Sequence, residues 1–254
     1  MLDRKPTAAS LFVILCEGDS EQIILPRIAS ALGLDIDPSF VAIVPLGGRH
    51  VNHFWRLLTE LKIPYATLLD LDLGRAGSGW GRIKYICEQL ITIDVKKSEL
   101  LAVTDKDGKK SILSDEDFST MEEWTDLAVL KQWIDFLENY GMFFSFPLDL
   151  DMAMLFKFPD VYRGLADRGP YSDVETASKA VLKEAGAGLS AYTGNLAKYR
   201  DLFPWYNYLF LGQSKPSTHL LALSKIENNE LAKKAPTEIK RLLKFADSKI
   251  KLAE

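Results

Sequence analysis

The sequence is poor in the sulfur and nitrogen side chains that build many metal centres. Its 254 residues include two cysteines and three histidines, and their spacing matches no zinc motif. Cys16 and Cys87 fall in segments with the composition of a buried strand and a helix, so we expect reduced, buried thiols. Any metal chemistry in this chain would therefore use oxygen ligands.

Long hydrophobic runs are also missing. No apolar segment approaches eighteen residues, and the first residues lack the layout of a signal peptide. At the same time 47% of the residues are apolar, which is enough for a well-buried core. These features predict a globular, cytoplasmic protein that makes no contact with a membrane.

Positive charge is scarce for a protein that binds nucleic acid. The chain has 31 basic and 35 acidic side chains and a formal net charge of -4. Phosphate contacts usually come from lysine and arginine, so the charge alone does not suggest nucleic acid. The acidic excess lies before residue 215, however, because the last forty residues hold nine basic and five acidic side chains. Bound divalent cations would neutralise part of that excess.

The first acidic motif follows an apolar run at residues 11–16, which is short and rich in β-forming residues and so predicts a core strand. Glu17 stands where that strand ends, and Gly18 permits a tight turn. A helix is expected over residues 20–32, with Glu21 in its first turn, where the helix dipole favours an anion. Two carboxylates at one strand-to-helix junction can share a divalent cation. The alternative is a capped helix with solvated acids.

The second acidic motif ends another short apolar run, which predicts a strand at residues 66–71. Asp70 and Asp72 are two residues apart, and on an extended chain such residues point to the same side. Like charges placed side by side repel unless a cation or a proton lies between them. Clustered carboxylates suit magnesium or manganese.

A third motif repeats this pattern after a strand expected at residues 142–146. Asp149 and Asp151 precede a helix expected at residues 152–158. One aspartate can be the N-cap and the other a first-turn acid, which requires no metal. Beside the two earlier motifs, we interpret this pair as part of a second ion site.

Strands and helices alternate along the chain, which is typical of a parallel sheet covered by helices on both faces. In such sheets ligands bind at the carboxyl ends of the strands, where the acidic motifs stand. We also expect a strand at residues 40–44, a helical insertion from about residue 82 to 140, and an aromatic strand at residues 205–211 that leads to Lys215. A helix at residues 50–61 is expected to turn four residues inward, namely Phe54, Leu57, Leu58 and Leu61.

These elements suggest a division of the chain. Residues 1–81, 142–158 and 203–225 are expected to form one discontinuous catalytic domain, residues 82–141 and 159–202 helical insertions that make a smaller lobe, and residues 226–254 a C-terminal helical tail.

The stretch from Gly74 to Gly81 is rich in glycine and matches no phosphate-loop motif. It either brings backbone amides close to a phosphate or simply connects two elements. If it contacts phosphate, the candidate residues are Arg75 and Ser78, together with Gly48 in an earlier glycine turn.

Glu17-Gly-Asp-Ser-Glu21, followed by Asp70-Leu-Asp72 after another strand, resembles the Toprim domain of topoisomerases, bacterial primases and overcoming-lysogenization-defect (OLD) nucleases. Four further segments are similar to the OLD branch, at residues 44–48, 61–70, 146–154 and 213–216. The resemblance covers about residues 10–225.

The resemblance implies a Toprim or Rossmann-like fold and a metal-dependent DNA endonuclease that nicks and cleaves by a two-metal-ion mechanism. Two Mg²⁺ or Mn²⁺ ions would be held by Asp70 and Asp72 with Glu17 or Glu21, and by Asp149 and Asp151 with the other glutamate. Lys215 would support negative charge in the transition state. Roles in DNA repair or phage defence would follow.

Partners are implied in the same way. OLD proteins resemble an ATPase fused to Toprim, and this sequence has no Gly-x-x-x-x-Gly-Lys-Ser/Thr phosphate loop. We therefore expect the C-terminal catalytic region without its ATPase domain, acting on DNA and in some cases beside a UvrD-type helicase.

Two other functions stay open at this point. A Toprim protein can act on RNA or in primer synthesis, and an α/β module can use the same acids only to cap helices. Topoisomerase chemistry would need a tyrosine nucleophile, and none of the four available tyrosines lies in a context typical of one: Tyr192, Tyr199, Tyr206 and Tyr208.

Overall fold

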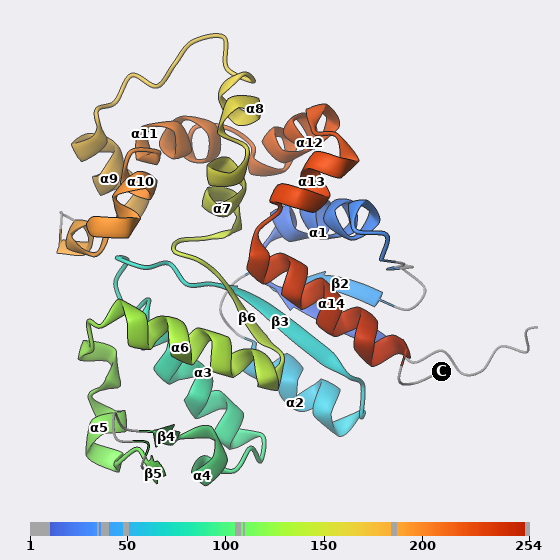
Figure 1. The fold of residues 1–254 in the computed structure, drawn as a ribbon, viewed down its shortest axis with the longest axis vertical. Coiled ribbons are helices and arrows are strands. Elements are labelled where there is room, and N and C mark those ends of the chain that lie inside the picture. Colours follow the sequence, from blue (N-terminus) through green and yellow to red (C-terminus); the bar gives the residue numbers. More distant parts are fainter. Residues whose placement is uncertain are drawn as a thin grey trace, which may run out of the picture.

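The computed structural model describes residues 11–34, 36, 41–47, 51–104, 108, 110–183 and 187–251. Its centre is a four-stranded sheet with the strand order β2-β1-β3-β6, in which all three strand pairings are parallel (Figure 1). The strands are β1 (Phe12–Cys16), β2 (Val41–Pro45), β3 (Tyr65–Asp70) and β6 (Met142–Ser145). The predicted α/β class, a parallel sheet flanked by helices, is confirmed.

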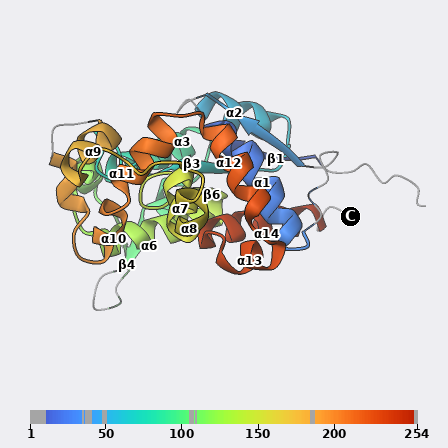
Figure 2. The same ribbon diagram turned by 90° about the horizontal axis from the view of Figure 1, so that it is seen from above.

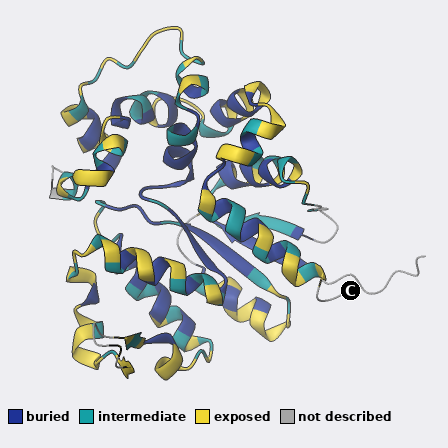
Figure 3. Ribbon diagram, in the orientation of Figure 1, coloured by how far each residue is buried: buried dark blue, intermediate teal, exposed yellow. Residues whose placement is uncertain are grey.

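The three strands β1, β3 and β6 form the buried middle of the molecule (Figure 3). Their nearly continuous apolar sequences are typical of parallel strands that are covered on both faces. The register pairs Cys16 with Leu68 and Asp70 with Ser145, so the three strands end at the same edge of the sheet. The segments that follow them carry the three acidic motifs to that edge.

Helices cover both faces of the sheet. Helix α14 (Thr237–Lys251) packs on β1, β3 and β6, and its Phe245 ring meets Phe12 and Phe143 edge to face. Helix α2 (Asn52–Glu60) lies on the opposite side (Figure 2), where the Trp55 indole donates a hydrogen bond of 2.9 Å to Thr67. The segment expected to be a C-terminal tail thus contributes a core helix.

A smaller helical lobe lies beyond the carboxyl ends of β3 and β6 (Figure 1). It is formed by α7 (Leu150–Lys157), α8 (Pro159–Arg163), α9 (Val174–Leu182), α10 (Ala197–Arg200), α11 (Phe203–Tyr206) and α12 (Lys215–Lys225). The other helices are α1 (Asp19–Ala31), α3 (Trp80–Thr92), α4 (Lys97–Leu100), α5 (Asp115–Ser119), α6 (Leu127–Leu137) and α13 (Asn228–Lys234). In the described part of the chain no helix is long and apolar enough to cross a membrane.

The prediction of which α2 residues face the core is wrong. The buried stripe consists of Val51, Trp55 and Leu58, because the large indole fills the space under the helix and finds a hydrogen-bond partner there. Three of the four residues that were expected inside are exposed instead: Phe54 (39%), Leu57 (49%) and Leu61 (58%).

The prediction of a strand at residues 205–211 is also wrong. The segment is helical, with α11 followed by a π-helical turn at Asn207–Leu211. Phe203, Tyr206 and Phe210 recur at helical spacing, and all three are buried inside the smaller lobe. A second departure lies in the insertion, which is not wholly helical because β4 (Ala102–Thr104) and β5 (Lys110–Ile112) form an antiparallel hairpin.

The glycine-rich stretch after Asp72 packs against the smaller lobe. Gly74 has φ +89°, and a Cβ placed there would stand 2.8 Å from the Gly188 carbonyl oxygen. We expect Gly74→Ala to lower the free energy of unfolding by about 1–3 kcal/mol, because the backbone would be strained and the two loops forced apart.

Urea denaturation measures this effect, and Gly81→Ala is the matched control. Gly81 lies in α3, and its new Cβ would have its nearest neighbour at 3.9 Å, so we expect an unchanged or slightly higher stability. Equal effects of the two substitutions would contradict this role of Gly74.

Candidate metal centre

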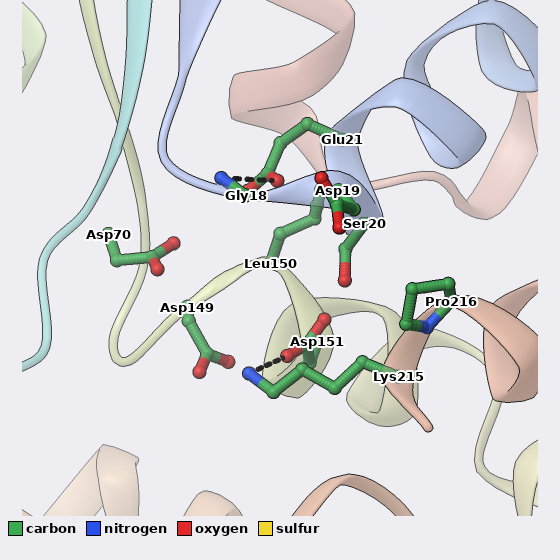
Figure 4. Close-up of a pocket in the computed structure, with 10 residues that line it drawn as sticks. All are labelled: Gly18, Asp19, Ser20, Glu21, Asp70, Asp149, Leu150, Asp151, Lys215 and Pro216. Carbon is green, nitrogen blue, oxygen red and sulfur yellow. Dashed lines mark hydrogen bonds and ion pairs between the residues drawn. The ribbon is translucent and has the colours of Figure 1, made fainter. Parts of the chain in front are cut away.

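A cavity of about 200 Å³ lies at the carboxyl ends of the strands (Figure 4). Four of the six predicted acidic ligands line it, together with the predicted lysine: Glu21, Asp70, Asp149, Asp151 and Lys215. They come from β3 and from the first turns of α1, α7 and α12, so four separate elements converge on one space. Gly18, Asp19, Ser20, Leu150 and Pro216 complete the lining.

Asp70, Asp72 and Asp149 form the tightest acidic group in this region. One carboxylate oxygen of each lies within 4.8 Å of those of the other two. Asp70 Oδ1 is buried and has no hydrogen-bond partner. Burial and the charges of Asp149, Glu17 and Glu21 raise the pKa of Asp70 well above its usual range. An unpartnered buried oxygen among like charges is what a divalent cation would satisfy, so the residues present fit such an ion.

Asp149 is held from two sides. Its Oδ1 accepts a hydrogen bond of 2.9 Å from the Met152 backbone amide as the N-cap of α7, and its Oδ2 accepts one from the Tyr206 hydroxyl. Burial and the charge of Asp151 raise the pKa of Asp149 to about 6. The capping geometry considered for this motif is therefore present, and the same carboxylate also lines the cavity.

Glu21 closes the cavity from the α1 side. The side chain is 4% exposed, and its Oε2 accepts a hydrogen bond of 3.2 Å from the Gly18 backbone amide. Burial above all, with the charges of Asp151 and Asp149, raises the pKa of Glu21 to about 8. Glu21 therefore adds a further acidic group to a crowded set of carboxylates.

Glu17 and Asp72 do not line the cavity, because a buried arginine holds them. The guanidinium of Arg82, on α3, lies 2.6 Å from Glu17 Oε1 and 3.1 Å from Asp72 Oδ2. Glu17 Oε1 also accepts a hydrogen bond of 3.1 Å from the Asp70 backbone amide. Asp72 adopts a left-handed conformation with φ +54°, so the backbone is not extended there as expected, but the carboxylates of Asp70 and Asp72 still approach each other as predicted.

The expected phosphate contacts have other partners here. The Arg75 guanidinium pairs with Asp72, and its Nε donates a hydrogen bond of 2.9 Å to the Val181 carbonyl. The Ser78 hydroxyl lies 3.5 Å from the Ala76 carbonyl oxygen. Gly48 lies outside the described residues.

Both carboxylate oxygens of Asp151 have a side-chain partner. Lys215 Nζ lies 2.5 Å from Oδ2, and His219 Nε2 donates to Oδ1 at 2.7 Å. The Tyr162 hydroxyl in turn contacts His219 Nδ1 at 2.6 Å. Burial raises the pKa of Asp151, but the hydrogen bond from His219 and the charge of Lys215 outweigh burial and bring this pKa below its usual range. Asp151 is thus an ionised acceptor that fixes the position of the lysine.

Lys215 remains a cation in this setting. Burial lowers its pKa, but the nearby charges of Asp151 and Asp149 outweigh burial and raise it above its usual value. The lysine reaches the cavity from the first turn of α12, rather than from the end of a strand as expected.

His219 is fully buried, and sequence reasoning gave it no role. We expect His219→Ala to lower the free energy of unfolding by about 2–4 kcal/mol, because Asp151 and Tyr162 each lose a buried hydrogen-bond partner. Thermal or urea denaturation measures this loss.

His53 provides the comparison, because it lies on the exposed side of α2. His53→Ala should change the stability by less than about 0.5 kcal/mol. If both substitutions had the same small effect, the network around Asp151 would not stabilise the lobe.

Comparison with known proteins gives two kinds of match. Residues 10–72 match the family model described as "Overcoming lysogenization defect protein-like, TOPRIM domain". No curated protein matches the chain significantly. Among solved structures, the C-terminal region of the Burkholderia pseudomallei OLD protein is similar, with a TM-score of 0.53 and 17% identity over 95% of this chain and 98% of that chain.

The C-terminal region of the Xanthomonas campestris pv. campestris OLD protein is also similar, with a TM-score of 0.51 and 20% identity over 96% of this chain and 95% of that chain. At these identities the structural matches establish the fold, and the family match covers the two acidic motifs that end β1 and β3. Residues 10–72 are therefore similar to the TOPRIM domain of OLD-like proteins, within a chain that has the fold of the C-terminal region of OLD proteins.

Proposed function

We propose that this protein is a metal-dependent DNA endonuclease that hydrolyses phosphodiester bonds with two divalent ions, Mg²⁺ or Mn²⁺. One observation carries the proposal: buried carboxylates from separate elements and one lysine ammonium converge on a single cavity at the carboxyl edge of the sheet. The OLD-like TOPRIM match supports a nuclease over other uses of such a cavity.

Asp70, Asp72 and Asp149 are the residues that would hold the first ion, because their carboxylate oxygens lie closest together, so Asp149 moves to this ion from the second, to which the resemblance assigned it. Glu21 and Asp151 line the same cavity and would contribute to the second. When bound, such ions neutralise the phosphate and activate water for attack on phosphorus. Glu17 would act indirectly, because its carboxylate accepts a hydrogen bond from the Asp70 backbone amide and pairs with Arg82.

Lys215 would support the charge that develops during cleavage. Its ammonium group is pre-positioned by Asp151, and Asp151 is in turn held by His219. A cation that is held in place beside the reacting phosphate stabilises a developing oxyanion without reorganisation. The protein residues would thus orient the phosphate and support the leaving oxygen.

Hydrolysis is favoured over a covalent tyrosine intermediate. Tyr206 is the tyrosine that contacts an acidic ligand, but its hydroxyl donates to Asp149 and burial raises its pKa well above the usual range. Tyr192 is buried as well, and its hydroxyl donates to the Leu73 carbonyl. Neither hydroxyl is poised as a nucleophile.

Incubation of supercoiled plasmid and of RNA with Mg²⁺, Mn²⁺, Ca²⁺ or a chelator tests the proposal. We expect nicked and linear plasmid with Mg²⁺ or Mn²⁺ and intact plasmid with the chelator. Cleavage of RNA alone would point instead to an RNA-directed Toprim protein. Intact DNA and RNA under every condition would contradict a nuclease.

A further inference from the structure

A second cavity, larger than the candidate metal centre, lies between α6, α7, α10 and the first turn of α14. Its volume is about 320 Å³. The two cavities lie toward opposite ends of α7: Leu150 and Asp151 line the first, and Phe156 and Lys157 the second. Because α7 has eight residues, its ends are about 12 Å apart.

Aromatic rings form much of the wall of this second cavity. Phe156 and Tyr199 stack with ring centroids 4.4 Å apart and an interplanar angle of 30°. Phe146 lines the cavity as well, just beyond the end of β6. All three rings are only partly buried, so each keeps surface that a ligand can cover.

Three lysines surround these rings. Lys157 and Lys198 hold their ammonium groups 5.8 and 4.8 Å from the centre of the Phe156 ring, and Lys131 lies 5.6 Å from that of Phe146. Among the described residues none of the three ammonium groups has a carboxylate within ion-pair distance. Lys131 and Lys157 line the cavity, and Lys198 lies beside its Phe156 ring; in an acidic chain, three such lysines without carboxylate partners indicate an anionic ligand.

The other charged groups of the cavity do not cancel this excess. The Arg241 guanidinium is held by both oxygens of Glu138, at 2.9 and 2.7 Å from Nε. Glu238 is the one acidic side chain in the lining. The three lysines therefore outnumber Glu238, the acidic side chain that lines the cavity.

We propose that this cavity binds one nucleotide unit of the nucleic-acid strand, with an unpaired base against Phe146, Phe156 and Tyr199 and its phosphate near Lys131, Lys157 and Lys198. Aromatic surface beside unpaired lysines is how proteins bind single strands without sequence preference. The 12 Å between the ends of α7 correspond to about three or four stacked nucleotides. The inference rests on the proposed function, because one strand would run through both cavities.

Fluorescence anisotropy with a labelled twelve-residue oligothymidylate, in the presence of a chelator, tests this site. The double variant Lys157→Gln, Lys198→Gln should bind at least tenfold more weakly, and the slope of log K against log salt should fall by about 0.7 because the contact with one phosphate is lost. Tyr199→Leu should weaken binding at least fivefold through lost stacking.

Matched controls separate the site from general charge effects. Lys225 and Lys244 are exposed and lie outside the cavity, so Lys225→Gln, Lys244→Gln should leave the salt slope unchanged. Tyr171, which is 80% exposed, gives Tyr171→Leu as the aromatic control. Equal losses in the site variants and the controls would overturn the proposal.

Two further comparisons define the ligand and the relation between its binding and DNA cleavage. Thymidine monophosphate should compete only at concentrations far above the oligonucleotide, and equally tight binding of the free nucleotide would overturn a strand site. If plasmid cleavage is absent but oligonucleotide binding still depends on Lys157 and Lys198, the nuclease proposal fails and this site stands. If cleavage occurs and the site variants bind normally, this inference fails alone.

Discussion

Asp70→Asn is expected to reduce metal-dependent DNA cleavage by about a thousandfold or more while making the metal-free protein more stable. Asp70 lies at the centre of the carboxylate group, and its Oδ1 is buried without a hydrogen-bond partner. The amide keeps the shape of the side chain but removes a charge that Asp149, Glu17 and Glu21 repel. The substitution therefore relieves repulsion and removes a metal ligand in one step.

Plasmid cleavage and urea denaturation in a chelator measure the two effects. Mn²⁺ should raise the melting temperature of the wild type, because an ion that binds the folded state stabilises it. It should not raise the melting temperature of Asp70→Asn, which has lost a ligand for the ion. Asp201→Asn, at an exposed carboxylate outside the cavity, should behave as the wild type in both measurements. Retained cleavage in Asp70→Asn would show that this group is not the metal ligand.

Lys215→Ala is expected to lower cleavage by about a hundred- to a thousandfold while leaving Mn²⁺ binding nearly intact. The lysine contacts Asp151 and faces the cavity, but its charge does not favour a cation there. Single-turnover cleavage and a Mn²⁺ titration by calorimetry separate the two effects.

Lys225→Ala is the matched control for this experiment, because it removes an exposed lysine at the other end of the same helix. Its cleavage rate should equal that of the wild type. A loss of Mn²⁺ binding in Lys215→Ala as large as its loss of cleavage would assign Lys215 to the assembly of the site rather than to the reaction.

The sequence predicted the parts of this site that depend on neighbouring residues. Short apolar runs identified β1, β3 and β6, and the acids that follow them could be placed at one edge because parallel strands end together. Glu21 in the first turn of α1 follows from the helix dipole, and Asp149 at the start of α7 follows from helix capping, and both are local rules. These predictions needed no knowledge of distant contacts.

The groups that hold the acids could not be predicted in this way. Arg82 meets Glu17 across 65 residues of sequence, and His219 meets Asp151 across 68. A lone arginine or histidine on a helix carries no local signal of such a partner. Tyr206 was available as a tyrosine, but its contact with Asp149 depends on a segment whose aromatic residues were taken for a strand.

Manganese-soaked crystals, measured near the Mn absorption edge, would show whether the buried carboxylates of this cavity hold metal ions. We expect anomalous density beside Asp70, Asp72 and Asp149, with a second peak toward Glu21 and Asp151 for a two-ion site. A single peak at the first group would retain the metal centre but remove the two-ion mechanism. Clear density for the protein with no anomalous peak in the cavity would contradict a metal centre at this site.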